Sequence, residues 1–342
     1  MPESRSGVLA AGHFIVDHVK IVNYWPEQDA LATIVDEKRG NGGCAFNCLM
    51  DLAKLGAAFP LSAAGLVGQD QDGEWVREQC RLAEVDATAL LAVPELPTSY
   101  TLVMSASDTG RRTFFHRRGA TIRFNGKHVP LQTTRAKILH VGYVGLLDAF
   151  EFQAGNHHGY AELLAQARKV GMITSVDLVS NPGADLQGLL APALPEIDWL
   201  FGNESEIARA AGVPSPGPTS CERFASSMKA GQKLIKAGVR RAVIVHFPQG
   251  AVAITPKGHY LQGSVKMPPK RIRGTAGAGD AFSAGALIGL NANWAMPAVL
   301  ELACCIAAAS LEDETCSAAI KPWQECLTLG RRLGFTETVS VV

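Results

Sequence analysis

The chain has 342 residues, of which 47% are hydrophobic and 19% are charged, a balance typical of a globular protein with a substantial core. Its 32 basic and 32 acidic side chains give a formal net charge of zero, which argues against a nucleic-acid coat or a membrane-surface binder. The first seven residues carry charges but no apolar signal segment, so we expect a soluble, cytoplasmic protein.

Short apolar, β-branched runs alternate with helical patterns along most of the chain. The expected strands are 8–11, 61–67, 137–144, 172–178, 199–203, 241–246 and 251–255, and the expected helices are 45–55, 75–83, 159–170 and 221–237. This alternation predicts an α/β fold with a mostly parallel central sheet covered by helices on both faces, a three-layer sandwich. The Pro- and Gly-rich segment 214–218 is interpreted as a surface loop, and His157-His158 as loop residues.

Two segments interrupt the alternation. Residues 15–22 and 30–35 are extended with no helix between them, and residues 100–105 and 112–116 flank a turn by composition. We expect these four strands to form a small β-sheet lid, within about 13–38 and 98–125, above the crevice at the strand ends. The whole chain, 1–342, is then one domain.

The lid segment is rich in arginine. Arg111, Arg112, Arg117, Arg118 and Arg123 lie close together, and no acidic residue occurs between Asp108 and Asp148. Solvated side chains are one interpretation. The alternative hypothesis is that Arg117 or Arg118 faces the substrate and binds its carboxylate or phosphate.

Eight cysteines are present, and none forms a C-x-x-C pair or lies near histidines at zinc spacing. We expect free thiols in a reducing compartment. The long apolar region at 281–311 is broken by Asn291, Asn293, Pro297 and Glu301, so it predicts two buried helices rather than a membrane span.

The most informative segment is Gly274-Thr275-Ala276-Gly277-Ala278-Gly279-Asp280, which precedes a stretch of small residues. It predicts a glycine-rich turn that enters a helix, where backbone N–H groups and the helix dipole bind an anion beside the Asp280 carboxylate. The alternative is that Asp280 only caps a helix. No G-x-x-x-x-G-K-[ST] run and no G-x-G-x-x-G after the first strand occur, which excludes a P-loop enzyme and argues against dinucleotide binding.

Asn203 and Glu206 are three residues apart where a strand is followed by a helix. Together they are suited to hold Mg²⁺ through water molecules, because Mg²⁺ dehydrates reluctantly. The alternative is a capping box, in which Asn203 caps the helix and Glu206 closes the arrangement.

In this order the motifs resemble those of the ribokinase family, the carbohydrate kinases of the PfkB type. Residues 42–47 (Gly-Gly-Cys-Ala-Phe-Asn) look like the N-terminal signature, and residues 11–17 look like the first strand followed by a substrate-binding Asp. Residues 112–120 are similar to the second lid strand, 203–206 match N-x-x-E, and 274–280 match most of D-T-x-G-A-G-D. The resemblance extends from about Val8 to the region of Ala309.

The resemblance implies an ATP- and Mg²⁺-dependent kinase that phosphorylates a hydroxyl of a sugar or sugar derivative. Asp280 would be the general base, and the backbone N–H groups around Ala278, Gly279 and Asp280, with Gly277 in the same catalytic turn, would stabilise the transferring phosphoryl group. The implied sugar-binding residues are Asp17, Gly42, Gly43 and Asn47; the implied nucleotide-binding residues are Thr275, Gly277, Gly279, Asn203 and Gly250; and the implied metal residues are Asn203 and Glu206.

Two departures from the family pattern stand out. Gly274 stands where the family commonly has an Asp of a monovalent-cation site, and the turn at 246–250 retains only its last glycine. Cation dependence and the phosphate donor therefore stay open. Two alternatives to a sugar kinase remain, a nucleoside kinase of the same family and a non-catalytic sugar- or nucleotide-binding regulator. The family also implies a homodimer formed through the lid.

Overall fold

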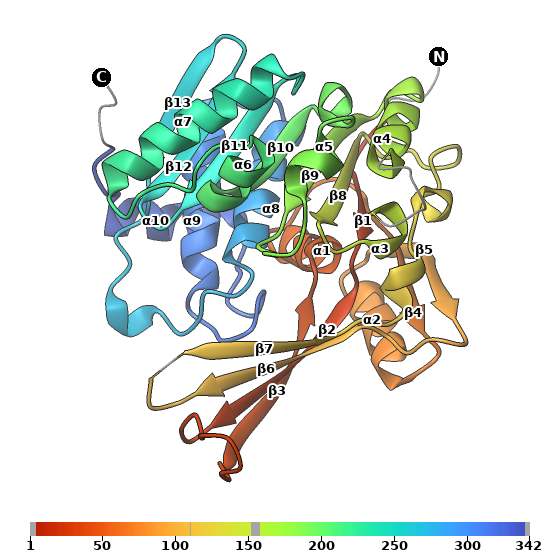
Figure 1. Cartoon of the computed structure of the whole chain (residues 1–342), viewed down its shortest axis with the longest axis vertical. Helices are drawn as coiled ribbons and strands as arrows, with labels where there is room; N and C mark the ends of the chain where they lie inside the picture. Colours follow the sequence, from red (N-terminus) through yellow and green to blue (C-terminus); the bar gives the residue numbers. More distant parts are fainter. Residues whose placement is uncertain (1–4, 110, 152–157, 339–342) are drawn as a thin grey trace.

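A nine-stranded sheet forms the centre of the protein (Figure 1). The computed structural model describes residues 5–109, 111–151 and 158–338. Across the sheet the strand order is β13-β12-β11-β10-β9-β8-β1-β4-β5. The bounds are β1 Val8–Gly12, β4 Leu61–Gly68, β5 Asp86–Val93, β8 Ile138–Val144, β9 Ile173–Leu178, β10 Trp199–Asn203, β11 Ala242–Phe247, β12 Gly250–Thr255 and β13 Gly258–Gly263. The strands from β11 to β5 are parallel, and β12 and β13 are antiparallel additions at one edge.

Helices cover both faces of this sheet. On one face lie α1 Cys44–Lys54, α2 Gln71–Leu82, α8 Ala278–Asn291, α9 Met296–Ser310 and α10 Trp323–Leu333. On the other lie α3 Asp148–Glu151, α4 Gly159–Lys169, α5 Leu186–Leu190, α6 Glu204–Ala210 and α7 Ser220–Lys236. Short 3-10 helices occupy Ala120–Arg123, Gly126–His128, Leu194–Glu196 and Pro269–Arg271. The three-layer α/β sandwich with a mostly parallel central sheet, expected from the sequence, is confirmed.

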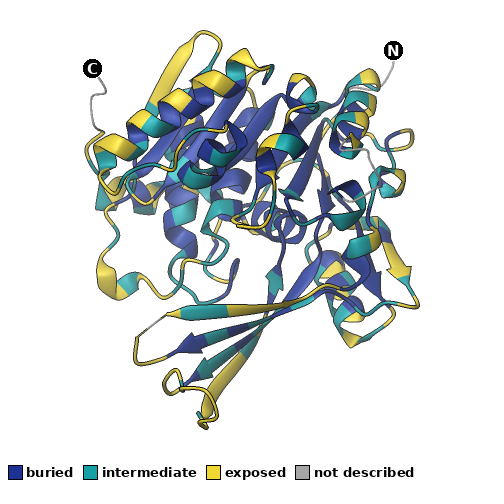
Figure 2. Cartoon of the chain, in the orientation of Figure 1, coloured by how far each residue is buried: buried dark blue, intermediate teal, exposed yellow. Residues whose placement is uncertain are grey.

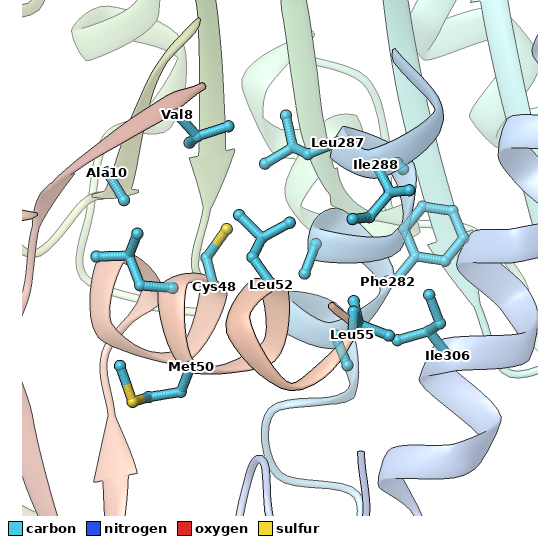
Figure 3. Close-up of a cluster of buried hydrophobic side chains, with 14 of the residues drawn as sticks. Val8, Ala10, Cys48, Met50, Leu52, Leu55, Phe282, Leu287, Ile288 and Ile306 are labelled. Carbon is cyan, nitrogen blue, oxygen red and sulfur yellow. The ribbon is translucent and has the colours of Figure 1, made fainter. Parts of the chain in front are cut away.

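The alternation of strand residues divides the core into two layers. In β1, Val8 and Ala10 join the apolar cluster under α1, α8 and α9, whereas Leu9 and Ala11 join the cluster on the opposite face. Figure 3 shows Cys48 and Leu52 of α1, and Leu55 just after it, in the first of these clusters. Because both faces of the central strands are buried (Figure 2), most of their residues are apolar; His140 in β8 and Asp177 in β9 are exceptions.

A second, four-stranded sheet projects from the body, at the bottom of Figure 1. Its order is β3-β2-β6-β7, with β2 Ile15–Val22, β3 Ile34–Gly42, β6 Tyr100–Ala106 and β7 Arg112–Arg117. We call it the lid sheet. The expected strand 30–35 was wrong: residues 30–33 are irregular, and the strand is the charged segment from Ile34 onward. Charged side chains are tolerated there because most of β3 is exposed.

Several elements escaped the sequence patterns. Among them are β5 and β13, which lie at the edges of the large sheet, α10, which packs on α9, and the short helices α3 and α5. In β5 most residues are exposed or half-buried and apolar and polar residues do not alternate clearly, so the hydrophobic pattern of this edge strand resembles that of a loop. In the described part of the chain no helix is long and apolar enough to cross a membrane. His158 precedes α4, and His157 lies outside the described residues.

The chain changes direction in the large sheet between β1 and β8. From β1 it runs outward to β4 and β5, and from β8 it runs the other way through β9, β10 and β11. Such a switch point leaves a crevice at the carboxyl ends of the strands, where α/β proteins bind ligands. Gly12 of β1 pairs with Gly142 of β8 at this end.

Candidate active site

Asp280, in the first turn of α8, lies at the centre of the site. Its side chain is buried and accepts hydrogen bonds from Asn47 Nδ2 at 2.8 Å and from the Tyr143 hydroxyl at 2.7 Å to each oxygen. Burial raises the pKa of Asp280 to about 6, Asn47 and Tyr143 oppose that rise, and the charge of Glu206 adds to it. At neutral pH the carboxylate is ionised and retains affinity for a proton, as a general base requires.

The start of α8 provides a cup of backbone N–H groups at residues 277–280, which we call the amide cup. Gly277 has φ of 73°, and a Cβ there would lie 2.5 Å from Cys316 Cβ. The first i to i−4 bond of the helix runs from Ala281 N to Gly277 O at 2.8 Å. The amides of Gly279 and Asp280 precede it, so they are directed out of the helix end, where the dipole favours an anion.

His246 borders the amide cup. It pairs with Asn203 in the last pair between β10 and β11. A Cβ on Gly279 would lie 3.1 Å from His246 Cε1. Burial lowers the pKa of His246 to about 4, so the imidazole is neutral at physiological pH. The glycine at 279 therefore lets an uncharged ring approach the cup. In the sequence, the turn at 246–250 is apparent only as a departure from the family pattern.

Two amide side chains connect the lid strand β3 with Asp280 through α1. Asn47 Oδ1 accepts from Asn41 Nδ2 at 2.6 Å, which also donates to Ser317 Oγ at 2.8 Å. This leaves Asn47 Nδ2 free to donate to Asp280. Asn47 is therefore oriented by Asn41, the second-last residue of β3.

Asp17 lies across the site from Asp280, on β2 of the lid sheet. Its carboxyl group packs over Gly42, where a Cβ would lie 2.7 Å from Asp17 Cγ. Gly43 has φ of 84°, and a Cβ there would meet His13 Cβ at 2.6 Å. Both glycines are thus required by close approach. Burial raises the pKa of Asp17 to about 7, Thr101 opposes the rise, and Asp280 adds to it.

Tyr143, which sequence analysis missed, is positioned by His13. The Tyr143 N–H donates to His13 Nδ1 at 3.2 Å, and His13 Nε2 contacts the Leu146 carbonyl at 3.1 Å. Burial lowers the pKa of His13 to about 4, so the ring is neutral and accepts through Nδ1. Tyr143 is 137 residues from Asp280, and no local motif identifies such a partner.

Asn203 and Glu206 form the capping box at the start of α6. Asn203 Oδ1 accepts from the N–H groups of Ser205 and Glu206, both at 2.9 Å. Glu206 Oε2 accepts from Asn203 N at 2.8 Å, and Oε1 accepts from Ser180 Oγ at 2.7 Å. Burial raises the pKa of Glu206, and its charge reaches Asp280. Each carboxylate oxygen retains one lone pair for a water molecule.

Three lid arginines occupy different positions. Arg118 forms an ion pair with Asp148; burial lowers the pKa of His13 and of His116, and the charge of Arg118 adds to that lowering. The Arg117 guanidinium lies 5.8 Å from the centre of the Tyr100 ring. Arg112 donates from Nη2 to the Arg273 carbonyl at 3.3 Å, and its Nη1 is buried and has no hydrogen-bond partner among the described residues.

Strand parity explains the position of Arg112. Thr101 of β6 pairs with both Asp17 and His116, and Ser105 pairs with Arg112. Arg112 therefore lies on the same face of the lid sheet as Asp17, four residues from His116, whereas Arg117 lies on the opposite face. A Cβ on Gly274 would lie 2.9 Å from Arg112 Cζ. The sequence does not give the register of β2 on β6 or of β6 on β7, so it does not assign this arginine to the face of Asp17.

Two expected nucleotide-binding residues lie at the margins of the site. The carbonyl of Thr275 accepts from Ala278 N at 3.4 Å, within the turn before α8. Gly250 begins β12 and pairs with Phe247 across a two-residue turn. The structure thus brings Asp17, Asn47 and Asp280 together around the amide cup, and places Asn203 and Glu206 at the neighbouring strand end.

This chain is similar to known carbohydrate and nucleoside kinases. The profile of the pfkB family carbohydrate kinases matches residues 6–323. A nucleoside kinase of Methanothermobacter thermautotrophicus is 28% identical over 61% of this chain and 63% of its own length, less than two thirds of that protein. An ATP-dependent ribose-1-phosphate kinase of Halopiger xanaduensis is 27% identical over 81% of this chain and 82% of its own.

Solved structures share the fold. A ribokinase of Arabidopsis thaliana, complexed with ribose and ATP, superposes with a TM-score of 0.74 at 19% identity, covering 96% of this chain and 99% of that one. A ribokinase of Thermotoga maritima gives a TM-score of 0.75 at 18% identity, again covering 96% and 99%.

Proposed function

The chain belongs to the pfkB family of carbohydrate kinases, and from this premise we propose that Asp280 is the general base for phosphoryl transfer from ATP to a hydroxyl of a sugar or sugar derivative. The hydroxyl oxygen attacks the γ-phosphorus, its proton moves to Asp280, and the bond to the ADP oxygen breaks. The observation that carries this is a buried carboxylate with a pKa of about 6, held by Asn47 and Tyr143 beside a cup of backbone amides.

The amide cup would stabilise the transferring group. Phosphoryl transfer is catalysed mostly by positioning and electrostatic stabilisation, and preorganised N–H donors are typically worth a factor of ~10²–10³ each. The left-handed Gly277 begins α8, so the amides of Gly279 and Asp280 would face the phosphoryl group at the helix end, and the Ala278 amide would join them by leaving the Thr275 carbonyl. Thr275 and Gly250 are proposed to contact the nucleotide beside this point.

The sugar would lie between Asp17 and Asp280. A carboxylate bridges two neighbouring hydroxyls well, because both of its oxygens accept. Gly42 and Gly43 allow close approach of the backbone, and Asn47 contributes an amide already oriented by Asn41. Arg118, near His13, is proposed to contact a polar or anionic substituent of the substrate.

Arg112 is proposed to bind a phosphoryl oxygen of the nucleotide. Its unpartnered Nη1 is buried on the face that also carries Asp17, and its guanidinium fills the space beside Gly274 at the start of the glycine-rich turn. A guanidinium pairs readily with phosphate, with donors in a fixed fork. This contact would replace the weak bond to the Arg273 carbonyl.

Mg²⁺ fits this site only through water. The side-chain oxygens of Asn203 and Glu206 already accept hydrogen bonds within the capping box, so we propose that Glu206 orients water molecules of a hydrated ion. When bound to the nucleotide, Mg²⁺ would neutralise phosphate charge. Glu206 itself holds the start of α6 and adds negative charge near Asp280.

The acceptor is proposed to be a sugar or a sugar derivative. A nucleoside is the second candidate, favoured by the similarity to a nucleoside kinase. Steady-state ADP release, measured over pentoses, hexoses, ketoses, sugar acids, sugar phosphates and nucleosides, tests both. Turnover of nucleosides alone would select the second, and binding of sugars without turnover of any acceptor would identify a non-catalytic regulator.

Two properties of the protein in solution follow from its surface and its thiols. A homodimer through the lid sheet is proposed, because Trp25 and Phe115 stack there with 47% and 52% of their surfaces exposed.

A reducing, cytoplasmic location is proposed because all eight cysteines are free.

A further inference from the structure

A polar cluster interrupts the apolar layer between the large sheet and α1. Cys44 lies in the first turn of α1, His140 in β8 and Asp177 in β9, and all three are buried. Their neighbours on this face of the sheet, such as Ile138 and Phe201, are apolar. Polar groups in such a layer cost free energy unless they have partners.

The three side chains point toward one another. One donor atom from each (Cys44 Sγ, a His140 ring nitrogen and an Asp177 oxygen) lies within 4.8 Å of the others. Cys44 Sγ and His140 Nε2 are 3.4 Å apart. Two ligands of a tetrahedral zinc ion, at ~2.3 Å for sulfur and ~2.0 Å for nitrogen, are separated by about 3.5 Å. The pair already has the spacing of two ligands to one ion.

The outward-facing atoms of the cluster have their own partners. His140 Nδ1 contacts Ser175 Oγ at 2.8 Å, and Asp177 Oδ2 accepts from Ser283 Oγ at 2.8 Å. Metal-binding imidazoles commonly bond through their second nitrogen in this way, which fixes the ring and leaves the other nitrogen for the ion. The absence of a side chain at Gly142 leaves the space that Cys44 Sγ occupies.

We propose that Cys44, His140 and Asp177 bind a divalent cation of the zinc class, distinct from the hydrated Mg²⁺ at the nucleotide. A thiolate and an imidazole select Zn²⁺ over Mg²⁺, which prefers oxygen ligands. The thiolate and the carboxylate together balance the two positive charges. Binding releases the thiol proton to solvent, so the affinity rises with pH. The alternative is a thiol-to-imidazole hydrogen bond with no ion.

Metal titration of the full-length protein tests the proposal. After treatment with a chelator and a reductant, the protein is titrated with Co²⁺ and with Zn²⁺ in excess Mg²⁺, and bound metal is measured by mass spectrometry. The exposed Cys221 is replaced by Ser in the background, because an accessible thiol binds metal adventitiously. We expect one equivalent per chain, with the absorption band of thiolate-bound Co²⁺.

Cys48 offers a matched control. It is a buried thiol one turn further along α1 and points into the apolar cluster of Figure 3. Cys44→Ser is expected to lose the thiolate–cobalt band and at least ~10-fold in affinity, as is typical when the partners of a metal site are removed. Cys48→Ser should retain both. Circular dichroism of each variant confirms that it is folded.

Ser175→Ala supplies a second variant that leaves all three donors in place. It should weaken metal binding by ~10–100-fold, because it removes the partner of His140 Nδ1. Substoichiometric binding by the wild-type protein, a thiolate band that persists in Cys44→Ser, or equal losses in Cys44→Ser and Cys48→Ser would each overturn the proposal.

Discussion

The amide cup and the lid sheet contribute to the same site but are built in opposite ways. In the cup, Asp280 is buried and its partners are supplied by α1 and β8. In the lid sheet, one face carries Asp17 and Arg112, and the other exposes Phe115 and Arg117 to solvent. A substitution in the cup therefore disturbs the hydrogen bonds around Asp280. In the lid sheet the two faces have different roles, so each face can be substituted separately.

The largest effect is expected from Asp280→Asn. The amide cannot accept the proton of the hydroxyl, so kcat should fall by ~10²–10⁴. Steady-state ADP release on the best acceptor measures this, and Asp36→Asn, an exposed lid carboxylate, is the control. Full activity of Asp280→Asn would show that the assigned base is wrong.

Gly277→Ala is expected to reduce kcat by ~10²–10³, the cost of displacing oxyanion donors. An alanine at this position would have to adopt a left-handed backbone conformation, and its Cβ would also clash with Cys316. Gly56→Ala separates these causes, because Gly56 has the same φ of 73° with no atom within 4 Å. That control should lose ~1–2 kcal/mol of stability and keep its activity. Equal kcat values for the two variants would contradict the proposed amide cup.

Arg112→Ala tests the inner face of the lid sheet. We expect the KM for ATP to rise by ~10-fold, because a charge-assisted phosphate contact worth ~1.5 kcal/mol or more is lost. Arg117→Ala, on the opposite face of the same strand, should leave the KM unchanged. If the KM for the acceptor rises instead, the phosphate or carboxylate that Arg112 binds belongs to the substrate.

Tyr143→Phe should shift the acidic limb of the pH profile. Asp280 must be ionised to act, so wild-type kcat/KM rises with pH through about 6. The Tyr143 hydrogen bond lowers the pKa of Asp280, and its removal should move the limb upward by about one pH unit. A limb that stays in place would mean that Tyr143 does not stabilise the carboxylate during turnover.

The smallest effect on catalysis is expected from Phe115→Ser, on the outer face of the lid sheet. The change removes the stacking partner of Trp25, so sedimentation should show a weaker dimer while kcat is nearly unchanged. Tyr260→Ser, at an exposed position of the large sheet, is the control. A monomeric wild-type protein would refute the dimer through the lid.

The sequence by itself determined the sheet-and-helix order, most strand positions and the glycine-rich turn before α8, because these depend on local periodicity and on glycine's backbone freedom. It also indicated Asp280, Asn47 and Asp17 through short motifs. Only the tertiary structure decided that Tyr143 and Asn41 orient these groups, and that Arg112 rather than Arg117 shares a face with Asp17. The Tyr143–Asp280 contact joins residues 137 positions apart, and the face of Arg112 depends on the register of the lid strands. Even the contact between Asn41 and Asn47, six residues apart, depends on how the end of β3 lies against α1, which no local pattern encodes.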